Sequence, residues 1–507
     1  MPILARKSLL IVLNNMLGGL LGFVTLSVIA HHLGADGLGI IGFGLSFLGM
    51  FTFISNMGFD SAHNKRMSEG GDPARCLGTY IYLKLILTVL MALVSVVAIY
   101  IYSRFFSGFS SVEEERVVIA FLGYYIVWSL SLIPITTFNS ERKQAKAQLP
   151  GVAELIVRAP LIIVLVVSGF GILYVALSYL AGILVLFFIA IYFMKGYTIK
   201  RPDRQMIRSY ALFAFPISLI SIIAVLYLYL DKVMIGVFWN NTEVGYYYGA
   251  QRIIMFLITS SSAVAILLFP TISSLHSKGE IHKINILIRG AERYLSMIVF
   301  PVAALTIAMN HSIVHLILGD GFGDADMILS FLSLYALVAI LNKPYSQVLT
   351  GTGRTGIAVR ISAVIFLANF LLNLLLIPKS MMGIPLAGLG GVGAAAATFL
   401  SDTGRFILLR REAGRIIGRT FQATVMIKHI TASSLSSGML YLLFTMAVPW
   451  ELRIILLIPG LIGGLIFYLF LLMIFREFTK SDLEFFMDML HPGKMGHYIR
   501  SELKDKE

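Results

Sequence analysis

The sequence contains little charge and almost no cysteine. Only 13% of its 507 residues are charged, whereas a soluble domain carries roughly 25% charged residues. A single cysteine, Cys76, excludes an internal disulfide framework and any metal site built from several cysteines. Water is therefore not the main solvent around this chain.

Residue sets that would perform catalysis are also lacking. No nucleophile with a base and an orienting group can be identified, and no outer loop is long enough to form a catalytic domain. The segment GTGRTG (351–356) matches a dinucleotide fingerprint, but it follows an apolar helix rather than a strand. His311 and His315 are four residues apart without a third metal ligand. We expect no enzymatic activity, no metal site and no bound cofactor.

Apolar residues dominate what is present. They make up 58% of the chain, the mean hydropathy is +0.85, and apolar stretches recur along the whole length. A helix of about 20 such residues crosses the hydrocarbon core of a bilayer. The net charge of +13 comes from bases that fall mostly in short loops, where membrane orientation explains them better than nucleic-acid binding. The composition predicts an all-α, multi-pass membrane protein.

Hydropathy predicts fourteen transmembrane helices. The basic N-terminus is followed by an apolar stretch that is too long for a signal peptide and has no cleavage site, so it counts as the first span. The predicted spans are 8–31, 38–59, 78–102, 117–139, 151–171, 173–194, 209–238, 244–270, 290–318, 326–350, 356–377, 390–409, 427–447 and 453–475.

Loop charge predicts the orientation of these spans. If the N-terminus is cytoplasmic, the outer loops hold only Arg104, Arg116, Lys379 and Arg453, while the inner loops hold most of the other bases. Bases accumulate on the cytoplasmic side of membrane proteins. We therefore expect a protein of the cell membrane with its N- and C-termini in the cytoplasm.

Two weak repeats suggest that the chain is duplicated. LGADGLGIIGFG (33–44) resembles NNTEVGYYYGA (240–250), with Gly39 and Gly245 separated by 206 residues, and GFGILYVALS (169–178) resembles GLGGVGAAAAT (388–398). Both pairs are six spans apart, and an even number predicts parallel repeats. The predicted domains are two six-helix bundles, 1–208 and 209–426, then helices 13 and 14 in 427–475 and a cytoplasmic tail, 476–507.

Several charged residues fall inside predicted spans, where an unpaired charge costs at least about 2.5 kcal/mol. Arg158 has Glu154 four residues before it, and Asp402 has Arg405 three residues after it, so both can form local ion pairs. Asp231 lies at the same predicted depth as Arg252 on the next span. The full set is Lys84, Arg158, Asp231, Lys232, Arg252, Lys343 and Asp402.

The excess of buried bases suggests an internal cavity for an anion such as phosphate or pyrophosphate. Lys84 and Lys343 have no acid at helical spacing and are the first candidates. The other candidates are Arg158, Lys232 and Arg252, although Arg252 can instead pair with Asp231. Alternatively, Lys84 and Lys343 extend towards the lipid headgroups.

The segments FAFPISLISIIAVLYLYLDKVMIGVFWNNTEVGYYYGAQRI (213–253) and LLFPTISSL (267–275) resemble helices 7 and 8 of the polysaccharide-biosynthesis, or Wzx-type, flippases. HHLGADGLGIIGF and NMGFDSAHNKRMSEG resemble the first turn of that family and the stretch after its second helix. The resemblance extends to about residue 412 and implies a MATE-like fold of the multidrug/oligosaccharidyl-lipid/polysaccharide exporter superfamily.

The resemblance also implies a function. A lipid-linked oligosaccharide on polyprenyl phosphate or pyrophosphate would move from the inner to the outer leaflet by alternating access. Lys65 matches a basic position after helix 2, so Lys65 and Arg66 are candidates for the lipid phosphate at an inner gate. His31 and His32 depart from the family, which often has an arginine there. Coupling to a Na⁺ or H⁺ gradient would use an acid such as Asp231 or Asp402.

Two other classes remain as alternatives. A multidrug or organic-cation exporter of the same superfamily would favour a cavity dominated by acids, whereas this chain has more buried bases. A membrane-embedded glycan polymerase or ligase would need a large outer catalytic loop. We expect a monomer whose partners are the lipid-linked glycan, membrane lipids and glycan-assembly enzymes, and no nucleic acid.

Overall fold

The computed structural model describes residues 2–70, 72–106, 108–260, 262–418, 422–480 and 482–484. These residues form two compact units, and the chain passes from unit 1 to unit 2 between Gly245 and Tyr246. The predicted cytoplasmic tail lies outside the described residues from residue 485 onward. The predicted bundle boundary at 208–209 concerns the sequence repeat and stays a prediction.

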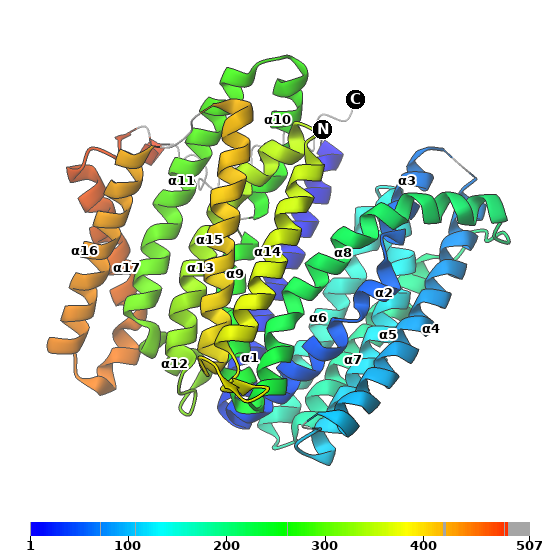
Figure 1. Ribbon diagram of the computed structural model, residues 1–507, viewed down its shortest axis with the longest axis horizontal. Coiled ribbons are helices and arrows are strands. Elements are labelled where there is room, and N and C mark those ends of the chain that lie inside the picture. The colour runs from blue at the N-terminus through cyan, green and yellow to red at the C-terminus, as the bar shows by residue number, and fades with distance from the viewer. Residues whose placement is uncertain are drawn as a thin grey trace. The chain divides into compact units, whose positions relative to one another are not determined.

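Unit 1 is built around α1 and α5. α5 packs against α1, α3, α4, α6 and α7, and α1 also packs against α6 and α8. Figure 1 draws these helices in colours from blue through cyan to green. The helices of this unit are α1 (Pro2–Gly49), α2 (Thr52–Asn56), α3 (Phe59–Ser68), α4 (Pro73–Phe105), α5 (Val112–Ser140), α6 (Gln144–Val167), α7 (Ile172–Phe193) and α8 (Arg204–Phe238).

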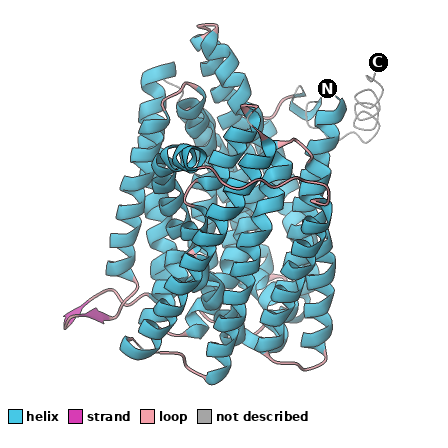
Figure 2. Ribbon diagram, turned by 90° about the vertical axis from the view of Figure 1, so that its right-hand side faces the viewer, coloured by secondary structure: helices cyan, strands magenta, loops and turns pink. Residues whose placement is uncertain are grey.

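Unit 2 is centred on α13, which packs against α10, α11 and α15, while α14 covers α15. Among the described residues, the strands β1 (Ser380–Met381) and β2 (Ile384–Pro385) form one small antiparallel hairpin, drawn in magenta in Figure 2. Its helices begin with α9 (Asn241–Ser260), whose residues 241–245 belong to unit 1. The others are α10 (Ser262–Ser277), α11 (Ile281–Ala308), α12 (Asn310–Leu318), α13 (Ala325–Gly351), α14 (Thr355–Leu376), α15 (Gly390–Ile417), α16 (Ala423–Met446) and α17 (Trp450–Ile474).

Short polar residues begin the long helices. The Asp72 side chain accepts a hydrogen bond from the backbone N–H of Ala74, and Pro73 occupies the first helical position of α4. Ser111 caps α5 in the same way, and three glutamates follow in its first turn. Such caps satisfy backbone donors that have no partner inside the helix, and acidic residues there complement the helix dipole.

All fourteen predicted spans fall on helices. Within the part of the chain that the structure describes, eleven helical segments are long and apolar enough to cross a membrane. The first two predicted spans merge into one such segment, Gly18–Ser68, the span at 244–270 is divided between α9 and α10, and α16 does not meet the threshold. The all-α, multi-pass fold class is confirmed, and the helices are consistent with the count of fourteen.

A glycine separates the first two predicted spans. Gly34 has φ 67° and ψ −172° inside α1, so the helix axis changes direction there without an intervening loop. Positive φ strains any residue with a Cβ, which explains a glycine at this position. The turn predicted after the first span is therefore a kink in a continuous helical segment.

The two repeated glycines contact one another's segments within unit 1. A Cβ atom added to Gly39 would lie 1.7 Å from the carbonyl oxygen of Asn241, and one added to Gly245 would lie 1.9 Å from the carbonyl oxygen of Ala35. The contact is reciprocal, because Ala35 and Asn241 are separated by the same 206 residues as Gly39 and Gly245. The repeat seen in the sequence thus brings equivalent backbone segments together.

We predict that Gly39→Ala and Gly245→Ala each destabilise the protein. The added methyl would overlap a backbone oxygen, and overpacking of this kind costs about 1–3 kcal/mol. Thermal unfolding of the purified protein in detergent should show a lower Tm for both variants. Gly22→Ala on α1 is the matched control, since its methyl would meet no atom within 4 Å. An equal Tm for Gly39→Ala and Gly22→Ala would contradict the close crossing.

An ionic cluster fastens the segment after α17 to α11. Arg293 of α11 donates to Glu477 at 2.8 Å and to both carboxylate oxygens of Asp482, each at 2.8 Å. Lys428 of α16 lies 3.1 Å from Glu477. Two bases therefore face two acids where α11, α16 and the end of α17 meet, which holds the last two helices onto unit 2.

The acids of this cluster give stability that depends on pH. The hydrogen bond from Arg293 lowers the pKa of the Asp482 carboxyl. Burial raises the pKa of Glu477, but hydrogen bonds from Arg293 and Lys428 outweigh burial and leave it lowered. A lowered folded-state pKa contributes stability that is present above the unfolded-state pKa, about 4, and is lost as the pH falls towards the folded-state value.

We predict that Asp482→Asn lowers Tm relative to the wild type at pH 7, and that this difference shrinks as the pH falls below about 4. Thermal unfolding of both proteins between pH 7 and pH 3 measures the difference. Glu484→Gln, at an exposed acid two residues away, is the control and should change little at any pH. A difference for Asp482→Asn that stays constant down to pH 3 would contradict the ionic role.

Candidate functional site

A buried ion pair lies inside unit 1. The Lys84 ammonium of α4 lies 3.0 Å from the Asp60 carboxylate of α3, and the Lys84 side chain is 0% exposed. Tyr80, one turn before Lys84, also donates to Asp60 at 2.7 Å. The alternative in which Lys84 extends to the headgroups therefore does not hold, because the ammonium is enclosed with its acid.

A histidine lies beside this pair. Nδ1 of His63 lies 3.0 Å from the Tyr210 hydroxyl, and Nε2 lies 3.0 Å from the Thr137 hydroxyl. Its ring stacks on Tyr80 with the centroids 4.2 Å apart. Because Tyr80 donates to Asp60, the histidine and the ion pair form one polar group that joins α3, α4, α5 and α8 in the apolar interior of unit 1.

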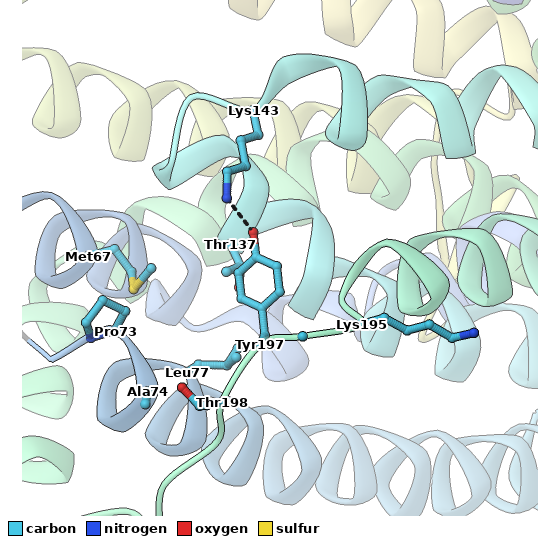
Figure 3. Close-up of a pocket in the computed structure, with 10 residues that line it drawn as sticks. Met67, Pro73, Ala74, Leu77, Thr137, Lys143, Lys195, Tyr197 and Thr198 are labelled. Atoms are coloured by element: carbon cyan, nitrogen blue, oxygen red, sulfur yellow. Dashed lines mark hydrogen bonds between the residues drawn. The ribbon is translucent and has the colours of Figure 1, made fainter.

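A cavity of about 330 Å³ opens at the end of unit 1 that is predicted to face the cytoplasm. Figure 3 shows Lys143 pointing towards Tyr197, whereas Lys195 points away from the other lining residues. Thr137 lines the cavity and also contacts His63, so the cavity reaches the buried polar group. The other lining residues are Met67, Pro73, Ala74, Leu77, Gly196 and Thr198.

Lys143, the lysine that points into this cavity, is paired. Lys143 lies 2.7 Å from Glu141 and 2.9 Å from the Tyr197 hydroxyl, and hydrogen bonding to Glu141 raises the pKa of Lys143. Burial, followed by the hydrogen bond to Glu141, raises the pKa of Tyr197. The cavity thus presents hydroxyls and a neutralised lysine rather than a concentrated positive charge.

Arg158 and Lys232 both lie against tyrosine rings in unit 1. Arg158 is 2.5 Å from Glu154, which confirms the predicted local pair, and its guanidinium lies 4.5 Å from the centroid of the Tyr179 ring. Lys232 is buried, donates to the carbonyl of Leu228 at 2.9 Å and lies 5.9 Å from the centroid of another tyrosine ring, that of Tyr229. These two predicted bases are therefore shielded by aromatic side chains.

The two bases predicted at an inner gate lie on the last turn of α3. Arg66 is 2.7 Å and Lys65 is 3.7 Å from Glu69, and Lys65 also lies 4.3 Å from the centroid of the Phe213 ring. Lys65 is exposed and Arg66 half-buried. Their charge is shared with one acid, so the segment carries a net positive charge.

Asp231 and Arg252 belong to different units, and their predicted pairing stays a prediction. Asp231 is 4% exposed in unit 1. In unit 2, Arg252 is exposed and donates to the Tyr248 hydroxyl at 2.8 Å, with its guanidinium 5.0 Å from the centroid of that ring. Within its own unit, Asp231 is therefore buried, whereas Arg252 is exposed and lies against a tyrosine.

The remaining predicted residues lie in unit 2. Lys343 of α13 is half-buried and donates to the carbonyl of Ile258 at 2.8 Å. Asp402 is 1% exposed, lies 3.2 Å from Arg405 as predicted, and accepts a longer hydrogen bond from Asn342 at 3.3 Å. Lys343 and Asp402 therefore lie on neighbouring helices, α13 and α15, that pack closely together.

Two ion pairs between different helices were not predicted. Asp60 lies within the family-like segment NMGFDSAHNKRMSEG, but it is 24 residues from Lys84, so helical spacing gives no signal for the pair. Glu292 of α11, which is buried, pairs with Arg410 of α15 at 3.0 Å, and Arg410 also lies 5.3 Å from the centroid of the Tyr345 ring. Arg410 was assigned to a loop by hydropathy, because α15 extends eight residues beyond the predicted span.

Comparison with known proteins gives one family match. The sequence model of the family described as "Polysaccharide biosynthesis protein" matches residues 4–276. The probable low-salt glycan biosynthesis flippase Agl15 of Haloferax volcanii is 24% identical over 478 residues, which are 94% of this chain and 97% of that protein. The probable flippase AglR of the same organism is 28% identical over 43% of this chain and 44% of its own.

Solved structures share the fold. The lipid II flippase MurJ in an inward closed conformation has a TM-score of 0.76 at 15% identity and covers 93% of this chain and 98% of its own. An inward-facing multidrug resistance MATE family transporter of the MOP superfamily has a TM-score of 0.66 at 16% identity and covers 78% of this chain and 94% of its own. The MATE-like fold is therefore confirmed.

We predict strong coupling between Lys84 and Asp60 in stability. Removing one partner of a buried ion pair leaves an uncompensated charge and costs about 3–5 kcal/mol. The Tm should fall for Lys84→Met and for Asp60→Asn, and the double variant should lose less than the two losses added together. Lys65→Met, at an exposed lysine, is the control. Additive losses in the double variant would show that the pair does not act as a unit.

Proposed function

Because this chain belongs to the polysaccharide biosynthesis protein family, we propose that it is a flippase that moves a lipid-linked oligosaccharide across the membrane. The near full-length match to a probable glycan biosynthesis flippase is the observation that carries this proposal. The fold shared with a lipid II flippase supports it, since that likeness also extends over nearly the whole chain.

The physical need for such a protein follows from the substrate class. A glycan with a phosphate or pyrophosphate group is too polar to enter hydrocarbon, whereas its polyprenyl tail is soluble there. A helical membrane protein can shield the polar part while the tail stays in lipid. We propose transfer from the inner to the outer leaflet by alternating access between inward-open and outward-open states.

Basic side chains would receive the anionic headgroup. In unit 2, Lys343 is half-buried and donates to the carbonyl of Ile258, and Arg252 is exposed and donates to the Tyr248 hydroxyl. Lys65 and Arg66, at the end of α3, share one acid and keep a net positive charge. We propose that each of these bases contacts the phosphate groups at some stage of transport, and that Lys84 contributes only after its pair with Asp60 opens.

The proposal also includes the oligomeric state of the protein, its partners and the ion gradient that drives transport. The protein would act as a monomer in the cell membrane with both ends in the cytoplasm, and glycan-assembly enzymes would supply its substrate. It would transport rather than catalyse. A Na⁺ or H⁺ gradient would drive the cycle through a buried acid, for which Asp231 and Asp402 are the candidates because both are at most 4% exposed.

The multidrug exporter is the less supported alternative. The MATE transporter covers 78% of this chain, whereas the lipid II flippase covers 93%, so the likeness to the flippase extends over more of the chain. A cavity for organic cations would favour unpaired acids, and the buried acids Asp60, Glu154 and Glu292 each face a base. Transport of an organic cation but not of a lipid-linked glycan would reverse this preference.

We predict that Lys343→Ala slows translocation about tenfold or more, because a hydrogen bond to a charged group contributes about 1.5–3 kcal/mol. The protein is reconstituted in liposomes that contain a polyprenyl pyrophosphate-linked oligosaccharide, and a membrane-impermeant glycosidase measures how much glycan becomes accessible. Lys283→Ala, at an exposed lysine of α11 paired with Glu280, is the control. Wild-type rates for Lys343→Ala would remove this lysine from the headgroup site.

A further inference from the structure

A group of aromatic side chains surrounds Arg158 in unit 1. The rings of Tyr124 and Tyr179 meet edge to face with centroids 6.1 Å apart, and the Arg158 guanidinium lies over Tyr179. Tyr125 connects Tyr124 to Trp128, with centroid distances of 5.1 Å and 6.3 Å. Because α5, α6 and α7 all contribute to this group, it is built by the fold and not by one helix.

Tyr229 of α8 extends the same group. A Cβ added to Gly49 would lie 2.7 Å from both the Tyr125 hydroxyl oxygen and Cζ of Tyr229, so these two phenols meet above this glycine. Lys232 lies 5.9 Å from the centroid of the Tyr229 ring. Two bases, one on each side, therefore border a continuous aromatic surface.

This surface lies within the hydrocarbon layer. Counting about 1.5 Å per residue from the ends of α6, α7 and α8 that are predicted to face outward, Tyr179, Arg158 and Tyr229 lie roughly 11–14 Å deep. Trp128 is sixteen residues from the start of α5 and twelve from its end, hence near the middle. Tyrosine and tryptophan that anchor a protein at the membrane interface lie at the headgroups. These residues lie too deep for that role.

The Tyr125 hydroxyl donates to the carbonyl of Leu45 at 2.7 Å, whereas the polar atoms of the four other rings have no partner within the described residues. No hydrogen bond is found there for the hydroxyls of Tyr124, Tyr179 and Tyr229 or for the indole N–H of Trp128. All four side chains are half-buried, so part of each remains accessible. Polar groups exposed to lipid without a partner are costly, so this face should meet a polar ligand or water.

The chemistry of the surface selects the ligand. Aromatic rings attract cations, but the Arg158 guanidinium already lies over the Tyr179 ring, so that ring face is not open to an organic cation. A polyprenyl tail would leave the hydroxyls and the indole N–H unsatisfied. A sugar satisfies both requirements, because its C–H faces stack on aromatic rings while its hydroxyls accept and donate hydrogen bonds.

We propose that Tyr124, Trp128, Tyr179 and Tyr229, with Arg158 and Lys232 at the edges, form the subsite of unit 1 that binds the glycan part of the substrate. Glu154 is a positioning residue, since it holds the Arg158 guanidinium at 2.5 Å. This inference rests on the proposed function and assigns the sugar, rather than the phosphate, to this surface.

Two probes separate the sugar from the lipid. Undecaprenyl pyrophosphate and the same lipid carrying a disaccharide of N-acetylglucosamine are titrated into the purified full chain by calorimetry. Loss of one stacking ring should weaken binding of the disaccharide probe about 3- to 10-fold. We therefore expect Trp128→Leu and Tyr179→Leu to reduce affinity for that probe and to leave affinity for the bare lipid unchanged.

The controls distinguish stacking from folding. Tyr100→Leu removes a tyrosine that is 65% exposed on α4 and should alter neither affinity. Tyr179→Phe keeps the ring and should retain most of the affinity. In the Trp239→Phe/Trp450→Phe chain, Trp128 is the one remaining tryptophan, and its fluorescence should change with the disaccharide probe and not with the bare lipid.

Three other outcomes would contradict the glycan subsite or the proposed function. If the wild type prefers the disaccharide probe but the ring variants keep that preference, the glycan binds elsewhere and the subsite is wrong. If the ring variants weaken both probes equally, their role is structural and the subsite is again wrong. If the wild type binds neither probe, the proposed flippase function fails together with this inference.

Discussion

The cost of an unpaired charge in hydrocarbon governs the interior of both units. Three ion pairs lie in these interiors. Two of them join different helices, Lys84 with Asp60 and Glu292 with Arg410. The third, Arg158 with Glu154, lies within about one turn of a single helix. Because an isolated charge at this depth costs several kcal/mol, each pair restricts how its helices can pack. The apolar contacts alone would tolerate many helix rotations, whereas a base and its acid accept few.

Features that depend on neighbouring residues in the sequence could be predicted, whereas contacts between distant segments could not. Hydropathy is local, so all fourteen spans fell on helices, and the pair of Arg158 with Glu154 could be predicted because it lies within one helix. The pair of Lys84 with Asp60 could not, since it depends on how α3 packs against α4. The tyrosine environment of Arg158 was missed for the same reason, because its rings come from several helices.

The repeat is an intermediate case. Gly39 and Gly245 could be matched because small residues opened equivalent helices, but nothing in the sequence indicated that they would touch. The structure supplies that reason: each glycine admits the backbone oxygen of the other segment, so neither position accepts a side chain. A small residue that is needed for close backbone approach leaves a sequence pattern, whereas the contact itself depends on how the two helical segments cross.

A lysine that is paired with an acid can bind a phosphate only after that pair opens. A phosphate can approach Lys84 only where Asp60 yields, since the lysine is fully enclosed and the acid is the more exposed partner. Lys343, by contrast, is half-buried and donates to the carbonyl oxygen of Ile258, so part of its side chain is already accessible. The internal acids therefore do more than stabilise one conformation, because they set the free energy needed to expose each paired base.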